Sequence, residues 1–172
     1  MSVRVTIGYL SRNRPGYRAL QRERRYLRDP KWYSSKSASG SRGTVFTMLL
    51  GTGVDLIEVE RVAQSIERFG ERFLNRIYTP REIAYCNSKR RGAESFAARF
   101  AAKEAGAKAL GTGMNFGVSW KEIEVARALT GRPSLELSGR ARHIADRLGV
   151  RTISVSLTHT AQIAMAMVIM ES

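Results

Sequence analysis

Cysteine is nearly absent from this chain of 172 residues. Cys86 is the single thiol, so no disulfide can form within the chain, which is consistent with a reducing cytoplasm. Residues 164–170 belong to the longest apolar run, which is too short to span a bilayer, and the N-terminus lacks the apolar core of a secretory signal. These absences exclude a disulfide-framed secreted domain. They predict a cytoplasmic protein without a membrane partner.

Acidic residues are also scarce, with 15 Asp and Glu against 29 Lys and Arg, a net charge of +14. Such an excess suggests nucleic acid, a membrane surface or an acidic protein as a partner. The excess is unevenly placed, because residues 1–47 hold 11 basic and 2 acidic residues, whereas residues 48–172 hold 18 and 13. A basic nucleic-acid-binding module is therefore a competing interpretation, but it draws mainly on the first quarter of the chain.

The chain divides in composition near Met48. Residues 34–41 are a serine-rich, linker-like stretch, and residues 22–25 are a charge run. Such composition cannot bury enough apolar surface to offset chain entropy, so we predict that residues 1–47 are a disordered basic extension. Our hypothesis is that this extension results from an upstream start codon chosen in error and that the protein begins at Met48. An organellar transit peptide is an alternative, but Pro15 and Pro30 interrupt its helical pattern. Residues 48–172 form the predicted domain.

The domain reads as a mixture of strands and helices. Thr79, Pro80 and Glu82 form a helix start, and Gly111 and Gly149 are helix stops. Grouped helices beside a late hairpin favour an α+β fold over a doubly wound sheet. The expected strands are residues 49–59, 120–125, 134–137, 151–158 and 162–170, and the expected helices are residues 60–77, 79 onward, 94–110 and 138–148.

The glycine-rich turns do not match nucleotide-binding fingerprints. Leu56 stands where a dinucleotide motif requires its third glycine, and Phe116 does so after Gly111. Neither turn leads into the Gly-Lys-Ser/Thr of a phosphate-binding loop. The sequence therefore carries neither a dinucleotide-binding fingerprint nor a P-loop.

Two carboxylates stand out. Asp55 lies in an otherwise apolar strand, where burial costs several kcal/mol unless the group is paired or binds metal. Its structural alternative is a cap of the following helix. Glu104 lies one helical turn after Phe100 and one turn before Lys108, which suits a hard cation with a phosphate-bearing ligand. The alternative there is a surface ion pair at i,i+4.

Three separated motifs agree in order and spacing. They are Gly51-x-Gly53-x-Asp55 followed by Arg61, residues 96–113, and Ser156-Leu157-Thr158-His159-Thr160. Together they resemble the bacterial holo-[acyl-carrier-protein] synthases of the 4′-phosphopantetheinyl transferase superfamily. The resemblance covers residues 48–172 and none of 1–47. It implies an α+β fold with a small antiparallel-type sheet and one long helix, in homotrimers with active sites between subunits.

The resemblance also implies a reaction and its residues. The enzyme transfers 4′-phosphopantetheine from coenzyme A to a serine of apo-acyl carrier protein and releases adenosine 3′,5′-bisphosphate. Asp55 and Glu104 match the family's Mg²⁺-binding pair, and Lys108 matches a lysine that contacts the phosphates; these three are the predicted catalytic residues. The predicted coenzyme A contacts are Arg91, Arg99, Lys103, Lys108, Gly111, His159 and Thr160.

The predicted docking surface for the acidic carrier lies on the helix at 60–77. Arg68, Arg72 and Arg76 recur every four residues and so share one face of a continuous helix. The resemblance places partner contacts at Arg61, Arg68, Phe69 and Arg72. The structural alternative is an amphipathic helix with Phe69 and Phe73 in the core.

One departure from the family pattern affects the interpretation. Gly106 stands where the family has a larger apolar residue, and we expect it to loosen the helix or make room for pantetheine. A catalytically inactive carrier-binding homologue is a further alternative, against which the intact Asp55, Glu104 and Lys108 argue.

Overall fold

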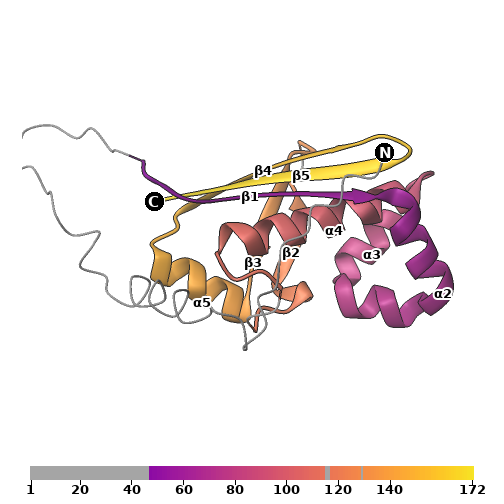
Figure 1. Cartoon of the computed structure of the whole chain (residues 1–172), viewed down its shortest axis with the longest axis horizontal. Coiled ribbons are helices and arrows are strands. Elements are labelled where there is room, and N and C mark those ends of the chain that lie inside the picture. Colours follow the sequence, from indigo (N-terminus) through magenta and orange to yellow (C-terminus); the bar gives the residue numbers. More distant parts are fainter. Residues whose placement is uncertain (1–46, 115–116, 129) are drawn as a thin grey trace, which may run out of the picture. The chain divides into compact units, whose positions relative to one another are not determined.

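The computed structural model describes residues 47–172 apart from 115–116 and 129 (Figure 1). The predicted basic extension over 1–47 therefore lies, except for Thr47, outside the described residues. The strands are β1 (Leu49–Glu58), β2 (Ile123–Arg127), β3 (Pro133–Leu137), β4 (Thr152–His159) and β5 (Ile163–Glu171). The helices are α2 (Val59–Ile77), α3 (Pro80–Asn87), α4 (Gly92–Ala109), α5 (Gly139–Leu148) and the 3-10 turn η2 (Trp120–Glu122).

The strands form two small antiparallel sheets. One has the order β1-β5-β4, with Asp55 opposite Ala166 and Val155 opposite Val168, and the other is the hairpin of β2 and β3. The late hairpin predicted from sequence is β4 and β5. The predicted α+β class is confirmed. The predicted strand at 120–125 is wrong in its first part, because residues 120–122 form the turn η2.

Local sequence signals explain the helix boundaries. Thr79 Oγ1 accepts a hydrogen bond from the Glu82 amide, and a Glu82 carboxylate oxygen accepts one from the Thr79 amide, which is the capping box of α3. Gly149 ends α5 in the left-handed conformation with φ 81°. None of the helices within the described residues is long and apolar enough to cross a membrane.

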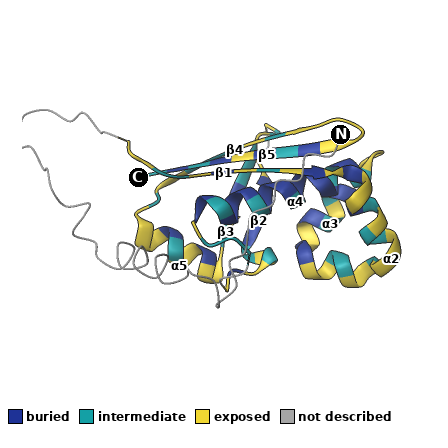
Figure 2. Ribbon diagram, viewed as in Figure 1, coloured by how far each residue is buried: buried dark blue, intermediate teal, exposed yellow. Residues whose placement is uncertain are grey.

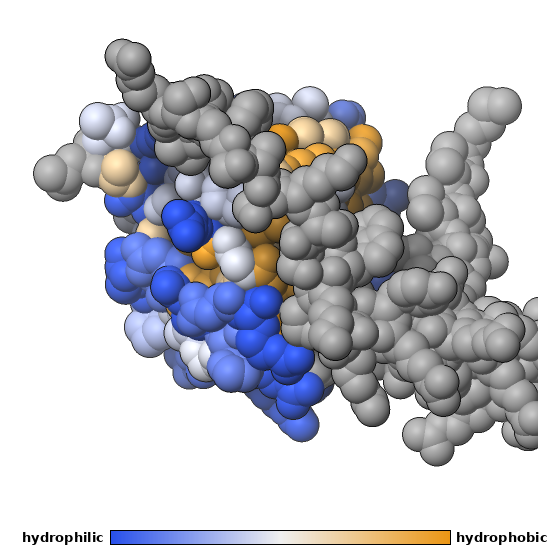
Figure 3. Space-filling model, turned by 90° about the vertical axis from the view of Figure 1, so that its left-hand side faces the viewer, coloured by the Kyte–Doolittle hydropathy of each residue, from blue (hydrophilic) through white to orange (hydrophobic). Residues whose placement is uncertain are grey.

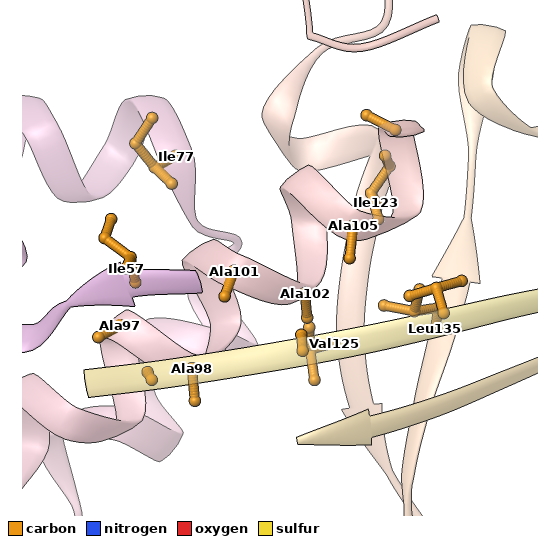
Figure 4. Close-up of a cluster of buried hydrophobic side chains, with 14 of the residues drawn as sticks. Ile57, Ile77, Ala97, Ala98, Ala101, Ala102, Ala105, Ile123, Val125 and Leu135 are labelled. Carbon is orange, nitrogen blue, oxygen red and sulfur yellow. The ribbon is translucent and has the colours of Figure 1, made fainter. Parts of the chain in front are cut away.

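Helix α4 is the centre of the core. It packs against β1 and β5 on one side and against α2, α3 and β2 on others (Figure 1). Apolar residues, mostly alanines, lie on nearly every side of α4. The helix is accordingly buried around nearly its whole circumference (Figure 2). Figure 4 shows Ile57 of β1, Ile77 of α2 and Val125 of β2 gathered around these alanines. Small side chains let the neighbouring elements approach α4 closely.

The glycines of β1 make the closest approach. A Cβ on Gly53 would lie 1.9 Å from the Ala105 carbonyl oxygen, and one on Gly51 would lie 2.1 Å from the Ala109 carbonyl oxygen. Only glycine fits at these two positions, since the obstacles are backbone atoms of α4. Asp55 follows on the same face of β1, because side chains alternate along a strand. The two glycines therefore bring Asp55 against α4.

Helix α2 is interrupted in its middle. Gly70 has φ 51° and ψ −134°, outside the helical range, and two helical pieces meet there. The prediction of one continuous arginine face is therefore wrong, because Arg68 precedes this break and Arg72 and Arg76 follow it. Phe73 packs edge-on against Tyr78, with ring centroids 6.2 Å apart, whereas Phe69 is 51% exposed. Phe73 therefore packs against the core, whereas Phe69 does not.

Candidate active site

Asp55 meets Lys108 where β1 crosses α4. The Lys108 ammonium lies 2.7 Å from Asp55 Oδ1 and also donates to the Val54 carbonyl oxygen at 3.0 Å. The two residues are 53 positions apart in the chain. Asp55 is not a helix cap, because β1 continues to Glu58 before α2 begins. The pair is partly exposed, so its charges remain accessible to a ligand.

Glu104 adds a second carboxylate to this place. Burial raises its pKa above the usual range, the Asp55 charge raises it further, and the Lys108 ammonium lowers it in part. The two acids therefore repel each other across a single compensating ammonium. A divalent cation would relieve that repulsion. We call Asp55, Glu104 and Lys108 the carboxylate site.

The donors of the carboxylate site fit Mg²⁺. Magnesium is commonly held by one or two carboxylates, with water and phosphate oxygens completing the coordination. Within residues 47–172, the described part holds no group of three or more His, Cys, Asp or Glu that could bind a metal.

A second polar group forms where α4 begins and β4 ends. A Glu94 oxygen lies 3.3 Å from Arg91 Nη1, and its other oxygen lies 3.2 Å from His159 Nδ1. The structure thus brings together Arg91 and His159, two predicted coenzyme A contacts. Sequence reasoning missed Glu94, although an acid in the first turn of a helix was the available signal.

Two further predicted contacts lie at turns. Thr160 Oγ1 accepts hydrogen bonds from the Gln162 and Ile163 amides and shapes the turn after His159. Gly111 follows the end of α4 with φ 72°, and its amide donates to the Lys108 carbonyl oxygen. Gly111 and Thr160 are both exposed, so each can meet a ligand.

Lys103 does not fit its predicted role as a coenzyme A contact. Its side chain is fully buried, and its ammonium lies 2.7 Å from Glu82 Oε2. It also donates to the carbonyl oxygens of Trp120 and Ile123. These three partners use every donor that an ammonium has. Lys103 therefore belongs to the core and joins α4 to α3 and β2.

Arg99 is likewise more enclosed than expected, with 4% of its surface exposed.

Gly106 does not make room for pantetheine. A Cβ there would meet the side chains of Ile123 at 3.1 Å and Leu135 at 3.3 Å. The glycine instead lets β2 and β3 pack on α4.

The predicted carrier contacts lie on the outer surface of α2. Arg61, Arg68 and Arg72 are exposed, and the Arg68 guanidinium lies 5.0 Å from the centre of the Phe69 ring. The role of these residues in docking stays a prediction.

Comparisons with known proteins define the class. The family model described as the 4′-phosphopantetheinyl transferase superfamily matches residues 51–167. The chain belongs to this superfamily, as the sequence motifs predicted.

Within it, the curated relatives are holo-[acyl-carrier-protein] synthases. That of Koribacter versatilis is 57% identical over 72% of this chain and 99% of the relative, and that of Solibacter usitatus is 56% identical over 73% and 100%.

Solved structures agree with this membership. The holo-[acyl-carrier-protein] synthase of Neisseria meningitidis is similar with a TM-score of 0.67 and 30% identity, over 73% of this chain and all of that one. The Helicobacter pylori enzyme, solved in complex with coenzyme A, has a TM-score of 0.62 and 31% identity over 69% of this chain and 98% of that one. The fold inferred from the motifs is therefore confirmed.

Proposed function

We propose that this protein is a holo-[acyl-carrier-protein] synthase, which transfers 4′-phosphopantetheine from coenzyme A to a serine of an apo-acyl carrier protein. The observation that carries the proposal is the carboxylate site, where Asp55, Glu104 and Lys108 meet. It lies in a chain that matches nearly the whole length of relatives with this name. The residues suit phosphoryl transfer, in which positioning and charge neutralisation dominate catalysis.

The reaction exchanges one P–O bond for another. The serine hydroxyl oxygen bonds to the phosphorus that carries pantetheine, and the bond from this phosphorus to the bridging oxygen of the pyrophosphate breaks. Adenosine 3′,5′-bisphosphate leaves with the electron pair of that bond. The serine proton goes to a base. The raised pKa of Glu104 makes its carboxylate a better proton acceptor than an ordinary glutamate, directly or through a water molecule.

Lys108 and Asp55 supply the remaining groups. The Lys108 ammonium, held by Asp55 and the Val54 carbonyl, neutralises negative charge on the phosphate oxygens. Asp55 and Glu104 would hold Mg²⁺, which would withdraw charge from the pyrophosphate. Arg91, Arg99, Gly111, His159 and Thr160 are the proposed residues of the coenzyme A site.

The proposed assembly is a homotrimer with active sites between subunits. One face of the β1-β5-β4 sheet exposes apolar side chains: Val54 is 48%, Leu56 58%, Ile163 41% and Met167 40% exposed. Val54 and Met167 are opposite each other across the strands. Figure 3, which views the end where β1 begins, shows apolar surface gathered on this side of the molecule. Exposed apolar area of this kind favours contact with another subunit.

In the proposed trimer, the carboxylate site of one subunit works with Arg61, Arg68, Phe69 and Arg72 of the next. Charge on these arginines steers the acidic carrier to the site. The proposed location is the cytoplasm, with which the single buried thiol, Cys86, is consistent.

Mass spectrometry of the carrier tests the activity. The purified protein is mixed with coenzyme A, Mg²⁺ and an apo-acyl carrier protein. We expect the carrier to gain one phosphopantetheine group and the gain to stop on adding EDTA. The matched control is the same mixture with Asp55→Asn in place of the wild type. A folded wild-type protein that modifies none of several carriers would contradict the proposal.

A further inference from the structure

Three cations surround the aromatic ring of Tyr85, which belongs to α3. The centre of the Tyr85 ring lies 4.1 Å from the Arg99 guanidinium carbon, 4.4 Å from Lys89 Nζ and 5.2 Å from the Arg127 guanidinium carbon. The cations come from α4, from the turn after α3 and from the end of β2. We call these four residues the Tyr85 cluster. A single ring does not by itself compensate three positive charges, since a cation–π contact contributes only about 0.5–2 kcal/mol.

The charge at the bottom of the cluster is uncompensated. Arg99 is 4% exposed, and its Nε has no hydrogen-bond partner. Its Nη1 donates to the Ser95 carbonyl oxygen at 3.3 Å. In the part of the chain that the structure describes, neither Arg99, Lys89 nor Arg127 forms an ion pair. A buried cation without a counter-charge costs several kcal/mol, so an anion is missing from this place.

Neighbouring groups do not supply that anion. Burial raises the pKa of the Cys86 thiol to about 11, so the thiol is neutral at physiological pH. Glu82 is already bonded to Lys103, and Glu94 is bonded to Arg91 and His159. A phosphate-bearing ligand can supply this counter-charge.

The exposed part of the Tyr85 cluster is preorganised for binding a ligand. Arg127 donates from Nε and Nη2 to the Gly131 carbonyl oxygen, at 2.9 and 2.6 Å, and Nη1 contacts the Tyr85 hydroxyl. These bonds fix the guanidinium beside the ring. Lys89 and Arg127 are both exposed, so a ligand can reach them from solvent. Donors fixed in advance lose little entropy on binding.

We propose that the Tyr85 cluster binds a phosphate group, with Lys89 and Arg127 in contact with it and Arg99 neutralising it from within. Three cations match a phosphate monoester, which carries close to two negative charges at neutral pH, better than a single carboxylate. The phosphate is either one of coenzyme A, in which case the inference rests on the proposed function, or a free inorganic phosphate ion. Tyr85 and Arg127 thereby join the list of binding residues, which the sequence motifs do not include.

Calorimetric titration of the full chain with coenzyme A, without carrier protein, tests the first source. Arg127→Gln removes one charge at an exposed position, so folding is not at risk. We expect the dissociation constant to rise about tenfold, because a charge-assisted hydrogen bond is lost. Arg132→Gln, an exposed arginine of the same hairpin, is the matched control and should change nothing. Titration with 3′-dephospho-coenzyme A then tests whether the cluster binds the 3′-phosphate, because the pyrophosphate is assigned to the carboxylate site.

Inorganic phosphate tests the second source. Phosphate should raise the melting temperature of the wild type, relative to chloride at equal ionic strength, and the rise should shrink in both Arg127→Gln and Lys89→Gln. Either loss, of coenzyme A affinity or of phosphate stabilisation, supports the site. Unchanged binding of both ligands in both variants would overturn it. Because neither measurement needs turnover, a wild type that binds coenzyme A but modifies no carrier would contradict the proposed function alone.

Discussion

Lys103 Nζ lies 2.7 Å from Glu82 Oε2, and neither side chain has any exposed surface. Glu82 also accepts hydrogen bonds from the amides of Thr79 and Val125, and Lys103 donates to two carbonyl oxygens. Every charged atom of the pair therefore has a partner, which is the condition under which a buried ion pair is tolerated. The pair joins α3, α4 and β2 at one point. Lys103 precedes Glu104 in α4, so the pair also fixes how α4 presents its carboxylate.

Breaking this pair should be costly. Lys103→Met leaves the Glu82 carboxylate buried without its partner, and we expect a loss of about 3–5 kcal/mol in the free energy of unfolding. Urea unfolding followed by circular dichroism measures it. The double variant Lys103→Met/Glu82→Leu removes both charges and should recover part of the loss. A single variant within about 1 kcal/mol of the wild type would show that the pair is not required for stability.

The close contact between β1 and α4 gives a second prediction. Gly53→Ala places a Cβ 1.9 Å from the Ala105 carbonyl oxygen, so the strand must move away from the helix. Overpacking of this kind costs about 1–3 kcal/mol, more than the 0.4–1 kcal/mol that alanine gains from a stiffer unfolded chain. We expect lower stability together with reduced turnover, because Asp55 moves with the strand. Thr52→Ala, the exposed neighbour, is the control, and equal stability of the two variants would contradict the packing argument.

Local patterns predicted the boundaries of the elements better than the site. The capping box of Thr79 and Glu82 and the stop at Gly149 depend on a few neighbouring residues, so the sequence alone reveals them. Lys103 and Lys108 could not be told apart in this way. The alanines of α4 lie on nearly every side of the helix, so no apolar stripe marks which lysine faces the core. The partner of Lys103 is Glu82, on another helix, and only the folded chain brings the two together.

Long-range relationships came from the family resemblance or from the structure. The meeting of Asp55 with Lys108 joins residues far apart in the chain, and no local pattern predicts it. The break in α2 was missed because the spacing of arginines continues across Gly70, although its backbone is not helical there. A glycine inside a helical pattern was the available signal.

Glu104 should lower stability at neutral pH while it serves catalysis. Its pKa is raised in the folded protein, so the stability that it contributes is present below its unfolded pKa and is lost as the pH rises through its folded pKa. Glu104→Gln has no such loss. We therefore expect a higher melting temperature than the wild type at pH 7 and a difference that vanishes below about pH 4.

The turnover of Glu104→Gln should fall, although its melting temperature rises. Loss of the proton acceptor lowers the rate by about 10²–10⁴-fold. Mg²⁺ should raise the melting temperature of the wild type more than that of the variant. Glu67→Gln, an exposed glutamate on α2, is the control. A variant that is both less stable and fully active would contradict the assignment.

The exposed apolar face of the sheet predicts association. Leu56→Arg places a charge at a position that is 58% exposed in the single chain, so the folded subunit should tolerate it. If the face is buried between subunits, the unpaired charge prevents assembly. We expect analytical ultracentrifugation to give a trimer for the wild type and a monomer for the variant, with turnover lost. Thr52→Arg at the edge of this face tests how far the contact extends. A monomeric, active wild type would contradict the proposed trimer.

Carrier docking on α2 should depend on charge. Arg68→Glu reverses an exposed charge beside Phe69, so we expect the KM for acyl carrier protein to rise about tenfold or more while the KM for coenzyme A stays unchanged. The wild-type KM for the carrier should also rise with salt, and this dependence should weaken in the variant. Arg147→Glu, exposed on α5, is the matched control for net charge. Gly70 separates Arg68 from Arg76. We therefore expect Arg76→Glu to change the KM for acyl carrier protein independently of Arg68→Glu. Equal effects of Arg68→Glu and Arg147→Glu would mean that the carrier responds to overall charge and not to this surface of α2.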